Sequence, residues 1–184
     1  MSENNQDITM DNQQGKMHFN IGWLVGMIEG EGCITLAAGA RTNSKYGHKI
    51  SPYLSITSTD KRLIDKAIEI IDFFHLPVHL DKREYHNGKK WKDRYTLQVF
   101  GQKRVKEWLI LIKPYLVGKQ EQAEIVLSFI EQRQKILNKH PWHKPYTNED
   151  LVLYEKVHKL NGRLGRSAKP SETKRRPGKP PVKV

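Results

Sequence analysis

The fold of this chain is decided by residues 22–33, which read Gly22-Trp-Leu-Val-Gly26-Met-Ile-Glu29-Gly30-Glu31-Gly32-Cys33. The apolar residues follow a helical pattern, and the glycines at 22, 26 and 30 are four apart, so a helix places them on one face. Each glycine costs a soluble helix about 1 kcal/mol relative to alanine, so the stripe requires a compensating reason. The reason that this spacing suggests is the close approach of a second helix. Gly22, Gly26 and Gly30 are therefore candidate interface residues.

The two carboxylates that end this stretch have different expected roles. Glu31 would lie at the C-terminal end of the helix, where the macrodipole disfavours a negative charge. A bound cation reverses that preference, so Glu31 is a candidate metal ligand. Glu29 cannot share a helix face with Glu31, and we expect it to make structural hydrogen bonds instead.

The charge of the chain indicates an anionic partner. The chain has 184 residues and a formal net charge of +12. Residues 21–161 alone carry 23 Lys and Arg against 16 Asp and Glu, so the excess is not confined to the basic end of the chain. A basic folded body favours nucleic acid as the partner, and a well-solvated charged surface is the alternative.

Targeting and redox signals are few. The single cysteine, Cys33, excludes an intrachain disulfide and favours a reducing compartment. No apolar run is long enough to span a membrane, and residues 1–18 are unlike a secretory signal or a transit peptide. We expect a protein that is not secreted and that works either in the prokaryotic cytoplasm or in a chloroplast or mitochondrion that encodes it.

The order of the expected elements predicts an α+β fold, with a four-stranded antiparallel sheet backed by helices. Composition predicts a disordered leader over residues 1–18, a folded domain over 19–161, and a basic loop and flexible tail over 162–184. Periodicity and turn signals predict, in order, a helix at 20–30 capped by Asn20, strands at 33–38 and 52–57, a helix that starts at Thr59-Asp60, a hairpin of 78–85 and 94–100, and helices near 105–112, 119–136 and 148–160.

Two stretches resemble a known family. Residues 24–32 resemble the signature of the LAGLIDADG homing endonucleases, with glutamate at both acidic positions and with Val25 and Gly30 in place of alanines. Residues 113–123 resemble the segment that carries the active-site lysine in single-motif chloroplast-intron enzymes, and the match places this lysine at Lys119. The resemblance implies the αββαββα homing-endonuclease fold over residues 19–161. Because only one motif is present, it also implies a homodimer in which each chain supplies half of the site, and a pseudo-palindromic DNA target.

The resemblance also implies roles for individual residues. Glu31 and the carbonyl of Gly30 would hold Mg²⁺, with Mn²⁺ as a substitute. Lys119 would support the attacking water or the leaving group. Ser58, together with either Lys61 or Arg62, occupies the region where family members order water near the metal, although glutamine is commoner than serine there.

The strands present a second set of side chains, on the face away from the expected core, that suits base reading in the major groove. One uncertainty is the phase of residues 80–85, because a bulge would turn Lys82 and Glu84 outward. The candidate base-reading residues are Thr35, Ala37, Arg41, Tyr53, Ser55, Thr57, Asp81, Arg83, Tyr85, Arg94, Thr96 and Gln98. The hairpin turn is rich in lysine, and residues 161–173 resemble the C-terminal loop of the single-motif enzymes. From these segments the candidate phosphate-binding residues are Lys89, Lys90, Lys92, Arg163, Arg166 and Lys169.

These observations predict a homodimeric, site-specific double-strand DNA endonuclease of the intron-homing type. One alternative is an RNA maturase that binds its own intron RNA, or a non-cleaving DNA-binding protein, with the same fold. The other alternative is a protein whose glycine stripe serves only to join two chains.

Overall fold

The computed structural model describes residues 4–40, 48–84, 92–139 and 146–162. The described part contains one four-stranded sheet and five α-helices. In chain order the elements are α1 (Asn4–Glu31), β1 (Gly32–Ala40), β2 (His48–Ser58), α2 (Lys61–Phe73), β3 (His79–Arg83), β4 (Arg94–Phe100), α3 (Gln102–Ile112), the 3-10 helix η1 (Lys113–Tyr115), α4 (Gln120–Lys139) and α5 (Asn148–Leu160).

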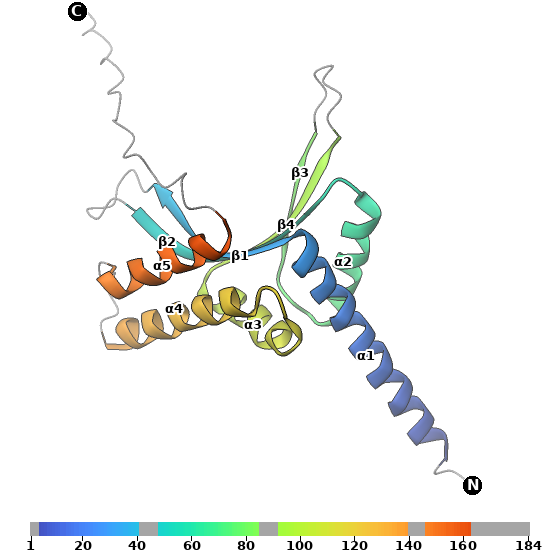
Figure 1. Cartoon of the computed structure of the whole chain (residues 1–184). Coiled ribbons are helices and arrows are strands. Elements are labelled where there is room, and N and C mark those ends of the chain that lie inside the picture. Colours follow the sequence, from blue (N-terminus) through green and yellow to red (C-terminus); the bar gives the residue numbers. More distant parts are fainter. Residues whose placement is uncertain (1–3, 41–47, 85–91, 140–145, 163–184) are drawn as a thin grey trace, which may run out of the picture.

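The sheet confirms the predicted α+β class. Its strand order is β1-β2-β4-β3, and each neighbouring pair is antiparallel. The helices lie along one side of the sheet, and the β3–β4 hairpin extends away from them (Figure 1). Alternate strand residues point toward the helices and form the core. Those that are at most 1% exposed are Ile34, Leu36, Leu54, Ile56 and Leu97.

The first helix is longer than the sequence suggested. α1 begins at Asn4, so Asn20 lies inside the helix, where it is 5% exposed, and does not cap it. Residues 4–18, which we expected to be a disordered leader, are helical. Adding residues to a helix that tertiary packing already holds requires no new nucleation, and this explains how a polar segment can extend it. The N-terminal end of α1 extends beyond the rest of the fold (Figure 1). No helix in the described ranges combines the length and the apolar character that crossing a membrane requires.

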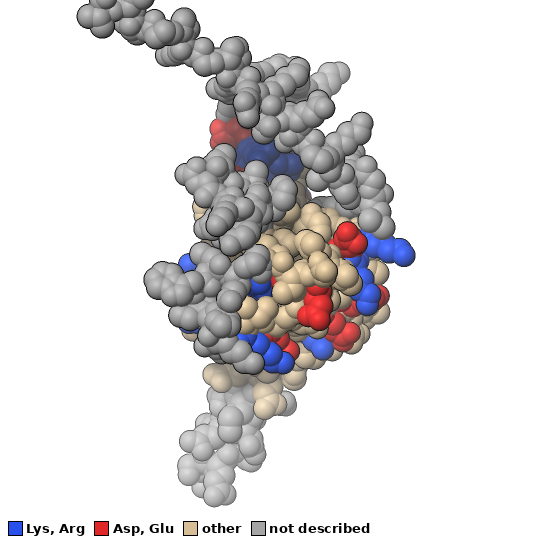
Figure 2. Space-filling model, turned by 90° about the vertical axis from the view of Figure 1, so that its left-hand side faces the viewer, with Lys and Arg blue, Asp and Glu red and all other residues tan. Residues whose placement is uncertain are grey.

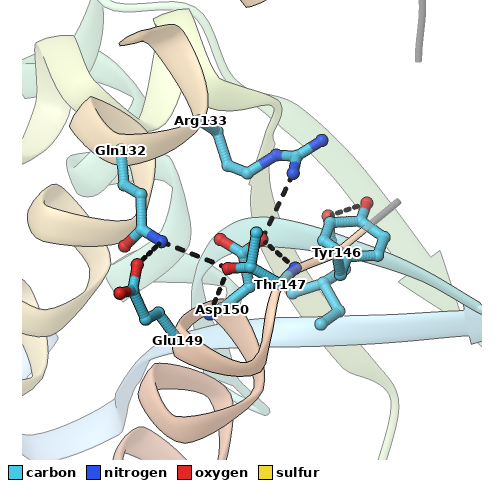
Figure 3. Close-up of polar contacts among 7 residues, drawn as sticks. Gln132, Arg133, Tyr146, Thr147, Glu149 and Asp150 are labelled. Atoms are coloured by element: carbon cyan, nitrogen blue, oxygen red, sulfur yellow. Dashed lines mark hydrogen bonds and ion pairs between the residues drawn. The ribbon is translucent and has the colours of Figure 1, made fainter. Parts of the chain in front are cut away.

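Helix α5 is held to α4 by a buried polar network (Figure 3). Arg133 of α4 and Asp150 of α5 are 4% and 0% exposed, and their side chains lie 3.2 Å apart. The Asp150 carboxylate also accepts a hydrogen bond from the backbone N–H of Thr147, and the Thr147 hydroxyl accepts one from the backbone N–H of Asp150, which completes a capping box.

The other end of α5 covers the free edge of the sheet. β1 is an edge strand, and the carbonyl of Ile34 accepts a hydrogen bond from the side-chain amide of Asn161 at 2.9 Å. A ring nitrogen of His158 lies 2.9 Å from the carbonyl of Leu36. These contacts satisfy edge groups that would otherwise be open to pairing with another strand.

Candidate active site and nucleic-acid interface

The candidate site is centred on the junction between α1 and β1. Glu31 is the last residue of α1 and its side chain is exposed. The strand begins at Gly32, where a Cβ atom would lie 2.5 Å from the carbonyl oxygen of Ile28, so the junction requires glycine. In the described part of the chain no side chain bonds to the Glu31 carboxylate. Among the described residues, the Glu31 carboxylate thus has no side-chain partner at the negative end of this helix.

Lys119 reaches the same end of α1 from the start of α4. Its ammonium donates hydrogen bonds to the carbonyl oxygen of Ile28, at 2.8 Å, and to that of Glu29. α1 has no basic residue in its own last turn, so Lys119 supplies the positive charge that favours a helix C-terminus. The structure thus brings Lys119 and Glu31 to the same end of one helix.

The side chain of Glu29 holds the segment that carries Lys119. One carboxylate oxygen accepts hydrogen bonds from the backbone N–H groups of Val117 and Lys119, at 2.8 and 3.2 Å. A Cβ atom on Gly118 would lie 2.9 Å from the other carboxylate oxygen, so glycine at 118 allows this close approach. The expectation that Glu29 makes structural hydrogen bonds is confirmed.

An open pocket of about 430 Å³ adjoins this arrangement. Three lining residues, Cys33, Gln122 and Asn161, were not among the predicted site residues. Gln122 is 7% exposed, and among the described residues its side-chain oxygen has no hydrogen-bond partner. Its position one helical turn after Lys119 is the sequence signal that would have identified it. The full lining is Glu29, Gly32, Cys33, Gly118, Lys119, Gln122, Leu160 and Asn161.

The donors at this site fit a hard divalent cation but are few. The Glu31 carboxylate and backbone carbonyls are the oxygen ligands that Mg²⁺ prefers. Across the described ranges no three His, Cys, Asp or Glu side chains gather as a metal site. The carboxylate of Glu29 is already engaged by backbone N–H groups. Of the two described carboxylates at this end of α1, only that of Glu31 is without a protein hydrogen bond, and one carboxylate is fewer ligands than a metal site needs.

Of the residues predicted for catalysis or metal binding, Lys119 lines this pocket, whereas Gly30, Glu31, Ser58, Lys61 and Arg62 do not. The hydroxyl of Ser58 accepts a hydrogen bond from the backbone N–H of Asp60 at 3.0 Å, which shapes the turn into α2. Lys61 pairs with Asp65 at 2.6 Å, and Arg62 pairs with Asp60 at 2.6 Å. The hydrogen bond from Arg62 holds the pKa of Asp60 below its usual value of 3.8. Nearby acids on α2 thus engage both basic candidates.

The strand register confirms the predicted phase of the sheet. The pairs Thr35–Tyr53, Ser55–Gln98 and Asp81–Thr96 lie opposite one another, so these residues share the face away from the core. The same register places Ala37, Thr57, Arg83 and Arg94 on this face, which we call the open face.

The alternative phase for β3 is excluded, because the pairing with β4 is continuous from His79 to Arg83. Lys82 lies on the core side of the sheet, where its ammonium is 5.8 Å from the centre of the Tyr95 ring. It also pairs with Glu84, whose hydrogen bond raises the pKa of Lys82.

The residues of the open face differ in how much surface they offer. Thr35 is only 1% exposed, and Ser55 and Thr96 are 7% exposed each. These small side chains lie between larger neighbours, and α5 packs along β1 beside Thr35. Arg83 and Lys92 are exposed. The half-buried members of the predicted set are Ala37, Tyr53, Thr57, Asp81, Arg94 and Gln98. The predicted residues Arg41, Tyr85, Lys89, Lys90, Arg163, Arg166 and Lys169 lie outside the described residues.

Basic and acidic side chains are interspersed on the side of the molecule shown in Figure 2. Among the residues described on that side, no block of a single sign forms.

The glycine stripe of α1 is open. Gly22, Gly26 and Gly30 are exposed, and a Cβ atom on any of them would meet nothing within 4 Å in the described part of the chain. This face of α1 therefore has room for the close approach of a helix from another chain.

Several solved structures share this fold. They include the homing endonuclease I-CvuI in complex with its target (TM-score 0.60, 20% sequence identity, covering 79% of this chain and 83% of that chain). An archaeal intron-encoded homing endonuclease, I-Vdi141I, complexed with DNA, also matches (TM-score 0.58, 14% identity, 83% and 89% coverage). The group I intron-encoded homing endonuclease I-CeuI, complexed with DNA, matches with a TM-score of 0.56 at 14% identity, covering 79% of this chain and 69% of that chain.

No protein-family model matches the sequence, and no curated protein sequence does. At the identities above, the structural likeness establishes the fold, and it is the fold of the LAGLIDADG homing endonucleases. The fold implied by residues 24–32 is thereby confirmed.

Proposed function

We propose that this protein is a site-specific DNA endonuclease that acts as a homodimer and requires a divalent metal. The observation that carries the proposal is the unpartnered carboxylate of Glu31, at the end of a helix whose exposed face is lined by glycines, with Lys119 fixed beside it. The structural neighbours described as homing endonucleases complexed with DNA support the same conclusion.

The homodimer follows from the incompleteness of one chain. Two copies of α1 packed through Gly22, Gly26 and Gly30 would bring their C-terminal ends together. The two Glu31 carboxylates would then face one site from opposite sides of a two-fold axis. Such symmetry matches a pseudo-palindromic duplex, in which each chain contacts one half-site.

Hydrolysis of a phosphodiester needs an activated water, charge neutralisation at the phosphorus and stabilisation of the leaving oxygen. Glu31 and the carbonyl of Gly30 would hold Mg²⁺, which supplies Lewis acidity and activates water when bound. The ammonium of Lys119 is anchored on carbonyl oxygens of α1 and adds a fixed positive charge that favours an anionic phosphate at this place.

The open face of the sheet would lie along the major groove. Arg94 and Gln98 have side chains that recognise guanine and adenine edges, and Arg83 and Lys92 are exposed for base or phosphate contacts. The basic residues of the hairpin turn and of the chain's C-terminal segment would add salt-dependent affinity.

The Glu31→Gln substitution tests this proposal. Duplexes that the full chain enriches from a randomised pool supply the substrate. With Mg²⁺ present, Glu31→Gln should lower the cleavage rate by more than about a hundredfold, because it removes a metal ligand, and should leave the affinity for the duplex unchanged. Gel analysis of cleavage and fluorescence anisotropy of binding measure the two quantities.

The matched control is Glu107→Gln, which removes one exposed carboxylate on α3. It should cleave at the wild-type rate. Wild-type cleavage by Glu31→Gln would contradict the proposal.

A further inference from the structure

The open face carries an aromatic pair that hydrogen-bond readout does not use. Phe100, the last residue of β4, lies opposite Tyr53 of β2, and their ring centres are 5.2 Å apart. Val99 points into the core and is 2% exposed, whereas Phe100 is 45% exposed. A large apolar side chain therefore lies on the face that the proposed function turns toward DNA.

The surroundings of Phe100 combine apolar and polar residues. A small hollow of about 150 Å³ lies beside the ring, lined by Pro77, Val78, His79, Gln98, Val99, Phe100 and Arg104. Gln98 lies two residues before Phe100 on β4, so both side chains are on the same face of the sheet. Arg104 is exposed at the start of α3. An occupant of this hollow needs an apolar group, with hydrogen-bonding atoms and negative charge nearby.

We propose that Phe100, supported by Tyr53, is a specificity-determining residue that contacts the C5-methyl group of thymine in the major groove. The inference rests on the proposed function. Thymine is the one base of DNA that presents an apolar group there, and phenylalanine is among the side chains that contact it. Arg104, which lines the hollow beside Phe100 and is exposed, favours an anionic partner such as DNA.

Deoxyuridine supplies a direct test, because it differs from thymidine only by the missing methyl group. The substrate is a duplex that the full chain enriches from a randomised pool, and affinities are measured without Mg²⁺ so that cleavage does not interfere. Each thymine is replaced in turn. At one thymine or more in each half-site the wild-type affinity should fall about fourfold, which corresponds to about 0.8 kcal/mol for one buried methyl group.

Phe100→Ala should abolish this fourfold difference at the same thymine. Phe73→Ala is the matched control, because Phe73 lies on α2 and is 44% exposed, close to the value for Phe100, so its loss should leave the uracil penalty intact. A wild-type scan in which uracil carries no penalty overturns the methyl contact without any variant. If Phe100→Ala does not fold, Phe100→Ser takes its place in assigning the penalty to Phe100.

The outcomes separate the two proposals. Sequence-specific binding that tolerates uracil at each position, or a penalty that survives in Phe100→Ala, overturns the methyl contact alone. A wild-type chain that binds enriched and random duplexes equally overturns the proposed function and this inference with it.

Discussion

Glu29 shows how one side chain can organise the candidate site without entering its chemistry. Its carboxylate holds the backbone of Val117 and Lys119 against the last turn of α1. Replacing it by alanine leaves two backbone donors without their acceptor. We expect Glu29→Ala to lower the free energy of unfolding by about 1.5–3 kcal/mol, the range for hydrogen bonds to charged groups. Urea unfolding measures this.

The control for this substitution is Glu107→Ala, which removes an exposed glutamate from α3 and should change stability by less than about 0.5 kcal/mol. Equal effects of the two substitutions would show that the contacts of Glu29 contribute nothing. Glu29→Gln, which keeps an acceptor oxygen, should fall between them.

Asp60 predicts a pH dependence of stability. The hydrogen bonds from Arg62 lower its pKa in the folded chain below the usual 3.8, so the unfolded chain binds the proton first as the pH falls. The contribution of the ionised Asp60 carboxylate to the free energy of unfolding is complete above pH 3.8. It is lost as the pH falls through the lower pKa of Asp60 in the folded chain. Asp60→Asn keeps a capping side chain but cannot titrate. Between about pH 5 and about pH 2 the unfolding free energy of the wild type should therefore fall more steeply than that of Asp60→Asn. Parallel pH profiles would contradict this.

Single residues also show what sequence patterns leave open. Ser58, with either Lys61 or Arg62, was predicted near the metal, and this stays a prediction; the structure shows that Ser58 shapes a turn and that Arg62 bonds the capping aspartate of α2. Ordering water near a metal and making a local turn or cap hydrogen bond require the same residue types. The local sequence pattern therefore cannot distinguish these two roles. Alternation correctly placed Thr35 on the open face, but its burial depends on α5, far along the chain.

At the scale of elements, the α4–α5 network should matter most to stability. Asp150→Ala removes the buried carboxylate that faces Arg133 and the capping box of α5. In this variant the Arg133 guanidinium still lies 4.8 Å from the centre of the Tyr146 ring. We therefore expect the free energy of unfolding to fall by about 3 kcal/mol, the low end of the range for removing one partner of a buried ion pair. Glu155→Ala, which removes an exposed glutamate from the same helix, is the control for urea unfolding. A loss below about 1 kcal/mol for Asp150→Ala would show that the buried pair is not holding α5.

Most elements could be predicted from the sequence, because strand alternation, the Asp60 cap and the stripe of α5 are local signals. The N-terminal extent of α1 could not, since a polar segment has no periodic apolar face to reveal it. The contacts of Lys119 with the end of α1 could not be derived from local pattern either, because they join segments distant in sequence. Only the family resemblance pointed to Lys119.

At the scale of the whole molecule, the proposed homodimer rests on the exposed glycine face of α1 and on the Glu31 carboxylate, which has no side-chain partner among the described residues. The core of one chain is complete without a partner, as the buried strand residues show. The candidate site is what one chain leaves unfinished. A dimer would thus serve the chemistry of the protein more than its folding.

Subunit mixing tests this central claim most directly. Wild-type chain and Glu31→Gln are produced together in equal amounts, with the selected duplex in excess, and total strand scission, nicks included, is measured per total protein. If two copies of Glu31 build one site and the chains pair at random, only wild-type pairs cut, so the rate should fall to about one quarter. The same mixture made with Glu107→Gln should keep the full rate. A fall to only about one half would mean that each chain cuts alone, and it would contradict the shared site.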